Sequence, residues 1–147
     1  MFPIIKKFAG NRFLEKMLLA STMEAFLRHS FLMIAVKDLD GNHVFASDTH
    51  LKAFGFQDVE QMNDVSLTPG WPQWMRDKWT ENDREVAKKR MPITGFEKVS
   101  MDPFAEISDE NNVQEFFDKK LPVFDLDGEV RHVAFMGLQT GAEDGIK

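Results

Sequence analysis

The tetrapeptide Asp-Leu-Asp-Gly occurs twice, at residues 38–41 and 125–128. Closely spaced carboxylates before a glycine are typical of calcium loops, which place Gly sixth, acidic ligands first, third and fifth, and a bidentate Glu twelfth. In the first copy, however, Val36 and Ser47 stand at the first and twelfth positions, and the second copy lacks the same two ligands. Both tetrapeptides are therefore expected to be hairpin turns and not calcium sites.

Histidines are the second group with catalytic or ligand chemistry, and the chain has four. His29 ends an apolar helical segment, where a cation near the last carbonyl groups is favourable. His43 and His132 fall in strand-like runs and are expected to face solvent, whereas His50 can point into the protein. The sequence contains no glycine-rich phosphate loop, no His-Glu-x-x-His and no nucleophile elbow. We therefore expect the chain not to be an enzyme.

Composition indicates one folded domain. The chain has 147 residues, 43% of them hydrophobic, including 14 Phe and 9 Met, which is enough to fill a sizeable core. It has no Cys, which excludes disulfides, thiolate metal sites and cysteinyl chromophore adducts. A net charge of −6 and a pI near 5.2 give a surface that repels phosphate backbones, so direct nucleic-acid binding is not expected.

The sequence shows neither a secretory signal nor a membrane span. Its first seven residues place their charges after a short apolar stretch, the reverse of the order in a signal peptide. The apolar segment 11–29 has its longest uncharged run from Met17 to Met23, and a spanning helix needs about 20 such residues. We therefore expect a cytoplasmic protein that does not contact a membrane.

The elements that position these residues are predicted by the spacing of apolar side chains. Segment 11–29 begins with Asn and repeats apolar residues three and four apart, which predicts an amphipathic helix. Two apolar runs, 31–36 and 42–47, flank the first Asp-Leu-Asp-Gly and predict a β-hairpin. Ser47 or the residue after it is a suitable N-cap for a short helix that stops at Gly55.

The rest of the chain predicts a helical middle and three more strands. A loop rich in Pro and Gly precedes a long helix over 75–90, with Trp79 and Val86 turned toward the body. Asp83 lies on the same face of this helix. A strand follows over 93–100, and two more flank the second Asp-Leu-Asp-Gly. This order predicts an α+β domain with a five-stranded antiparallel sheet.

These segments resemble the PAS sensor family over residues 31–140. The resemblance rests on four stretches in the correct order and spacing: FLMIAVKDLDGNHVFAS, HLKAFGFQDVEQM, WTENDREVAKKRMPI and DKKLPVFDLDGEVRHVAFMGLQT. It implies a PAS-like sensor domain over 31–140. The helix predicted from apolar spacing then forms a separate N-terminal segment within 1–30, for dimerisation or capping, and 141–147 forms a tail. Many PAS domains end in Asp-Ile-Thr, which helps pass a signal onward, whereas this chain has Leu-Gln-Thr at 138–140.

The resemblance also implies a small ligand between the sheet and the helical middle, and some PAS domains bind haem or flavin there. Relatives that bind haem usually carry its ligand on the long helix, but 76–90 contains no His, so the cofactor is left open. Apolar and aromatic side chains suit a ligand pocket, and they equally fill ordinary cores. The candidate ligand-binding residues are Met33, Phe54, Trp71, Trp74, Met75 and Phe135.

The last two strands carry apolar residues on both faces, so both faces of the sheet need a cover. The helical middle supplies one cover, and we expect a symmetric homodimer involving helix 13–27 to supply the other. The leading hypothesis is a PAS-type signalling module that binds an unidentified small molecule and regulates a kinase, nucleotide cyclase or transcription-regulator domain in cis or in trans. The alternative is a ligand-free module for dimerisation or protein interaction, and a small enzyme using the same cavity ranks last.

Overall fold

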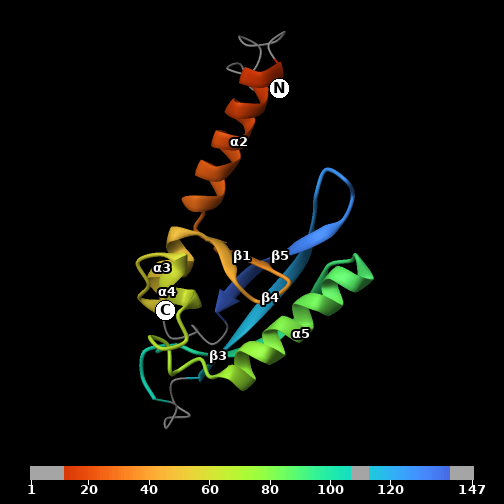
Figure 1. Cartoon of the computed structure of the whole chain (residues 1–147). Coiled ribbons are helices and arrows are strands. Elements are labelled where there is room, and N and C mark those ends of the chain that lie inside the picture. Colours follow the sequence, from red (N-terminus) through yellow and green to blue (C-terminus); the bar gives the residue numbers. More distant parts are fainter. Residues whose placement is uncertain (1–11, 107–112, 140–147) are drawn as a thin grey trace, which may run out of the picture.

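The computed structural model describes residues 12–106 and 113–139, and its elements follow the predicted order (Figure 1). The helix predicted over 11–29 is confirmed as α2, but its apolar residues are spread around the helix axis, so the predicted amphipathic character is wrong. The predicted tail, 141–147, lies outside the described residues. The helices and strands are α2 (Arg12–Arg28), β1 (Met33–Asp38), β2 (His43–Ala46), α3 (Asp48–Phe54), α4 (Val59–Asn63), α5 (Gln73–Lys89), β3 (Ile93–Ser100), β4 (Val113–Phe124) and β5 (Val130–Gln139).

The five strands form one antiparallel sheet in the order β2-β1-β5-β4-β3. α3 contacts β1, α4 contacts β2, and α5 contacts β4 and β5, so the helical middle covers one face, which we term the inner face (Figure 1). Side chains alternate between the two faces of a strand. Ala35 pairs with Phe135, and Phe135 pairs with Lys120, so these three side chains share the inner face. The predicted α+β class and five-stranded sheet are confirmed.

Both Asp-Leu-Asp-Gly tetrapeptides form the predicted hairpin turns. In the first, the backbone N–H of Asp38 donates to the carbonyl of Asn42 at 2.9 Å, and Gly41 has a φ of 91°. In the second, Asp125 takes the place of Asp38 and Gly128 has a φ of 81°. Glycine adopts this left-handed conformation without a steric penalty, which explains its place in both turns. The first turn connects β1 to β2, and the second connects β4 to β5.

α3 begins and ends where the sequence predicts, whereas α5 begins at Gln73, two residues before its predicted start. The Ser47 hydroxyl accepts the backbone N–H of His50 at 3.3 Å as the N-cap of α3, and Gly55 ends that helix with a φ of 77°. α5 buries Trp79 and Val86 against the sheet, as predicted. The same helix therefore brings Asp83, which is also buried, to the inner face.

α2 extends away from the sheet (Figure 1). Its side chains Met17, Leu19, Met23 and Phe26 are exposed in the single chain. Among the residues that the structure describes, no helix is long and apolar enough to cross a membrane.

Candidate functional site

A small cavity of about 40 Å³ lies between the inner face of the sheet and the helical middle. Its walls come from all five strands, from α3 and α5, and from the loop before α5. This is the position at which the sequence predicted a ligand. The lining residues are Ala35, Lys37, His43, His50, Phe54, Trp71, Trp79, Glu97, Val99, Phe116 and Phe135.

Three of the six predicted ligand-binding residues, Phe54, Trp71 and Phe135, line this cavity. Met33 and Met75 are buried in the same core cluster but lie outside the lining. The prediction for Trp74 is wrong, since its side chain is 63% exposed.

A helix that begins two residues earlier than predicted explains the result for Trp74. The sequence predicts α5 from residue 75, whereas the helix begins at Gln73. Successive helical side chains are about 100° apart around the axis. Met75, Trp79 and Val86 therefore share the buried face, and Trp74 falls on the solvent side.

The aromatic part of the cavity is a set of rings in edge-to-face contact. The ring centroids of Phe54 and Trp71 are 5.1 Å apart at 75°, and those of Trp71 and Trp79 are 5.3 Å apart at 88°. Such pairs are favoured by the opposite charges of ring face and ring edge. The Trp71 indole N–H also donates to the backbone carbonyl of Ser100 at 3.0 Å. These contacts fix the shape of the apolar wall.

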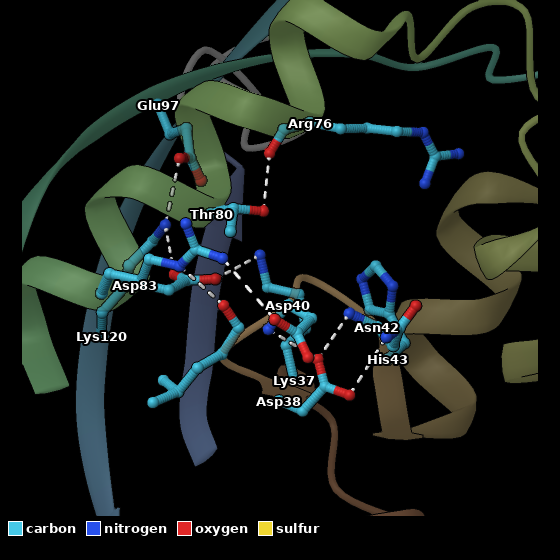
Figure 2. A network of polar contacts seen from close by, with 12 residues as sticks. Lys37, Asp38, Asp40, Asn42, His43, Arg76, Thr80, Asp83, Glu97 and Lys120 are labelled. Carbon is cyan, nitrogen blue, oxygen red and sulfur yellow. Dashed lines mark hydrogen bonds and ion pairs between the residues drawn. The ribbon is translucent and has the colours of Figure 1, made fainter. Parts of the chain in front are cut away.

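The other part of the inner face is charged. Figure 2 shows Lys37 of β1 and Lys120 of β4 converging on Asp83 of α5. Lys37 Nζ lies 2.6 Å from Asp83 Oδ2, and Lys120 Nζ lies 2.9 Å from Asp83 Oδ1. Lys120 also pairs with Glu97 of β3 at 3.3 Å. Both lysines and Asp83 are buried, so α5 is attached to two strands by ion pairs that exclude water.

Sequence reasoning did not identify this cluster as part of the site, although its signals are present. Lys37 follows Met33 and Ala35 at every second position of β1, so the strand period places it on the inner face. Asp83 lies one helical turn from Trp79 and Val86. A charged residue at a position that the period assigns to the interior indicates a buried partner.

The pKa values in the cluster follow from burial and from neighbouring charges. Burial lowers the pKa of Lys37, against the attraction of Asp83. Burial also acts to lower the pKa of Lys120, but the Glu97 and Asp83 carboxylates outweigh it and the pKa is raised. Burial, followed by the nearby Glu97 carboxylate, raises the pKa of Asp118 to about 6. Two ammonium groups thus face the carboxylates of Asp83 and Glu97.

His50 points into the protein, as predicted, and is only 5% exposed. Its ring packs edge-to-face on Phe54 and Phe135, with centroids 5.2 Å and 5.8 Å away. Its Nδ1 has no hydrogen-bond partner among the described residues. Burial, followed by the charge of Lys37, lowers the pKa of His50 to about 4, so the ring is neutral near pH 7. A neutral imidazole with an unpaired nitrogen therefore borders the cavity.

The prediction that His43 faces solvent is wrong. α4 packs on β2 and covers this residue. The Asn63 side-chain carbonyl accepts the backbone N–H of His43 at 2.8 Å and lies 3.2 Å from its Nδ1. Burial lowers the pKa of His43 well below its usual value. His132, in contrast, is half-buried on β5.

Neither haem nor flavin fits the cavity in this conformation. An engineered cavity of about 150 Å³ binds benzene, a far smaller molecule than haem or flavin, whereas this cavity has about 40 Å³. Within the described residues, no group of three or more His, Asp or Glu side chains is placed to hold a metal ion. The lining instead suits a small organic molecule or water.

A larger open cleft of about 480 Å³ lies on the surface between the β1–β2 turn and α5. Both arginines that line it already have partners within the protein. Arg84 donates to the carbonyl of Leu39 at 2.9 Å and lies 3.6 Å from the Asp40 carboxylate, and Arg76 donates to the carbonyl of Met62 at 3.2 Å. These contacts attach the turn to the helix, so the interior cavity is the better candidate site.

No family model and no curated protein matches the chain. Similar solved structures include a Vibrio cholerae VqmA dimer without target DNA, at 14% identity and a TM-score of 0.63 over 83% of this chain and 52% of that chain. The PAS domain of Bordetella pertussis BvgS matches at 15% identity and 0.59, over 87% and 90%. A Rhodobacter sphaeroides LOV protein matches at 13% identity and 0.56, over 88% and 70%.

The chain spans about half the length of the VqmA chains that it matches. At these identities, similarity shows the fold and nothing finer. The match to the BvgS PAS domain extends over most of both chains, and this chain has the five-stranded antiparallel sheet with a helical middle that its sequence predicted. The chain therefore has a PAS-like fold, as its sequence predicted.

Proposed function

We propose that this domain is a PAS-type signal-sensing module that binds a small molecule in its interior cavity. One observation carries the proposal: His50 presents an unpaired ring nitrogen beside a cavity walled by aromatic rings. An unpaired buried polar atom is costly, on the order of 1–3 kcal/mol, unless a ligand or water satisfies it. The similar structures described as VqmA bound to DPO and as a LOV protein support a sensing role for this fold.

The proposed module is a homodimer. Apolar side chains of β1 and β5, among them Val36, Ala134 and Met136, lie on the outer face, which the helical middle does not cover. α2 exposes further apolar side chains. A second copy buries both surfaces in a symmetric arrangement, because the same patch then contacts its own equivalent. One of the similar structures is described as a VqmA dimer.

Ligand binding regulates an output domain in cis or in trans, such as a kinase, a nucleotide cyclase or a transcription regulator. This requires the ligand to bind two packings of the dimer with different affinity, since equal affinity shifts nothing. VqmA is described in complex with DNA. For the present domain we propose no direct nucleic-acid contact, because its net charge is −6. We also propose no catalytic role for it.

The ligand-free alternative is a module for dimerisation or protein interaction with a filled core. It is favoured by the small volume of the cavity, about 40 Å³, which holds water without any movement of the walls. In this alternative a water molecule satisfies His50. The two functions differ in whether filling the cavity changes the affinity of the dimer.

Filling the cavity by mutation tests the proposal. Ala35→Leu adds three carbon atoms to the cavity wall, and the matched control Ala53→Leu adds them to the exposed side of α3. Freshly purified protein is analysed by native mass spectrometry and analytical ultracentrifugation. We expect a small molecule bound to the wild type and to Ala53→Leu but lost from Ala35→Leu, with at least a tenfold change in dimer affinity.

Wild-type protein that carries no small molecule, together with dimer affinity that Ala35→Leu leaves unchanged, would support the ligand-free alternative. Thermal unfolding checks that Ala35→Leu is folded, because extra methylene groups in a packed core destabilise by roughly 1–3 kcal/mol.

A further inference from the structure

We infer that the cavity selects a small uncharged molecule with a flat apolar frame and a hydrogen-bonding group, which Lys37 and His50 hold at the polar end. This inference rests on the proposed function and deepens it. It assigns the ligand class from three features of the described residues: the balance of buried charge, the unsatisfied hydrogen-bonding groups and the ring-lined walls.

Charge balance argues for an uncharged ligand. Lys37 is paired with Asp83 at 2.6 Å, and Lys120 is paired with both Asp83 and Glu97, at 2.9 Å and 3.3 Å (Figure 2). Two ammonium groups therefore already face two carboxylates, and Asp118 is a third buried carboxyl beside Glu97, with its pKa raised to about 6 by burial and by that neighbour. An anionic ligand finds no unpaired ammonium group, and a cationic ligand lies against the Lys37 ammonium group at the cavity wall. Either adds a buried charge without a partner, which is strongly unfavourable.

The donors and acceptors of the polar end define what the ligand must carry. The Lys37 ammonium group has three N–H donors, and Asp83 lies on only one side of it. His50 is neutral, so its two ring nitrogens comprise one donor and one acceptor, and Nδ1 is the unpaired one. An oxygen or nitrogen acceptor on the ligand satisfies Lys37, and a hydroxyl or amide group satisfies either tautomer of His50.

The walls define the shape of the ligand. Five aromatic rings line the cavity and meet largely at their edges, which favours a flat partner over a branched one. The present volume of about 40 Å³ is below the roughly 150 Å³ that holds benzene. Binding a ring therefore moves the helical layer away from the sheet. Because α5 supplies both Trp79 and Asp83, such a movement also strains the ion pairs to Lys37 and Lys120.

Three probes of similar size separate the possible recognition modes: benzene, phenol and benzoate. Each is titrated into isotopically labelled full-length protein and followed by NMR shifts of the backbone amides and of the His50 ring. Phenol is expected to bind at least tenfold more tightly than benzene or benzoate, with perturbations at residues that line the cavity and at the ring nitrogens of His50.

Variants locate the contact. His50→Phe keeps a ring that packs on Phe54, and Lys37→Met keeps the length of the side chain. Each variant is expected to weaken phenol binding at least fivefold and to leave benzene binding unchanged. The matched controls are His29→Phe and Lys52→Met, both at exposed positions. Because Lys37→Met can destabilise the fold, the shift of the wild-type His50 ring on phenol binding stands as a separate measurement of the same contact.

Equal binding of benzene and phenol overturns the inference, as does tighter binding of benzoate or the absence of any perturbation with all three probes. Failure of the inference and failure of the proposed function are distinguishable. If benzene or benzoate fills the cavity and changes the dimer affinity, only the ligand class is wrong. If phenol binds as expected but the dimer affinity stays the same, the ligand class stands and the sensing role fails.

Discussion

Each face of the sheet departs in one respect from the usual distribution of polar and apolar side chains. The inner face is covered by helices and carries Lys37 and Lys120, both buried. The outer face carries apolar side chains that reach solvent, such as Phe96, which is 66% exposed, and its ring neighbour Phe117. The two faces therefore have different requirements. The buried charges of the inner face need partners of opposite charge, and the apolar side chains of the outer face need to be covered.

The inner face meets its need within one chain, whereas the outer face does not. Asp83 reaches both lysines because α5 packs over β4 and β5, and β5 lies between the two strands that carry the lysines (Figure 2). Such pairs fix the orientation of a helix more than they add stability, since desolvation offsets much of the attraction. On the outer face, nothing in the described part of the chain plays the role of α5. The two faces therefore suit two tasks, an internal site on one side and association on the other.

The largest effect is expected from breaking the inner charges. Asp83→Asn leaves two buried ammonium groups facing an amide, and removal of one member of a buried ion pair costs about 3–5 kcal/mol. Urea unfolding is expected to show a loss of this size, and Glu81→Gln, an exposed change on the same helix, a loss below about 0.5 kcal/mol. A loss under about 1 kcal/mol for Asp83→Asn would contradict the buried network.

A smaller effect is expected from the pH dependence of His50. Its folded pKa of about 4 lies below the ordinary 6.5. Between these values the unfolded chain takes up a proton that the folded protein excludes, so stability present above pH 6.5 is lost as the pH falls. This single group accounts for a loss of about 2–3 kcal/mol between pH 7 and pH 4.5.

Urea unfolding at both pH values measures this loss. His50→Phe is expected to unfold with a shallower pH dependence by that amount, and His29→Phe, an exposed control, with the dependence of the wild type. Identical pH profiles for His50→Phe and the wild type would show that the folded protein protonates His50 as readily as the unfolded chain.

A substitution on the outer face is expected to have the smallest effect on folding. Its effect on association is expected to be direct. Met136→Glu places a charge among the apolar side chains of β5, where a second copy packs in the proposed dimer. Sedimentation is expected to show at least a tenfold weaker dimer, or about 1.4 kcal/mol, with monomer stability nearly unchanged. Lys78→Glu, on the exposed side of α5, is the control. A dimer that tolerates Met136→Glu would place the interface elsewhere.

Most of the fold was predictable because apolar spacing and turn residues are local signals. The two Asp-Leu-Asp-Gly turns were predicted alike, yet they differ in their surroundings. A Cβ on Gly41 would lie 2.5 Å from the Thr80 hydroxyl of α5, whereas a Cβ on Gly128 would meet nothing within 4 Å. The same four residues thus form one turn packed closely against the Thr80 side chain of α5 and one that accepts a hydrogen bond at Gly128 from Arg90, at the end of α5. Figure 1 shows the two turns.

The candidate site was only partly predictable because it depends on contacts between distant parts of the chain. Phe54, Trp71 and Phe135 are aromatic residues at element positions that face the core, so their types indicated a pocket. Asp83 meets Lys120 across 37 residues, a contact that no local pattern encodes. His43 was misjudged because a short edge strand is expected to face solvent, while α4 covers this one.

The most direct test of the account is a crystal structure of the protein purified from its own cells without added ligand. We predict electron density for a small uncharged molecule between the inner face and α5, within hydrogen-bonding distance of His50 Nδ1, in a cavity larger than about 40 Å³. A cavity of unchanged size that holds only water at His50 would contradict ligand sensing.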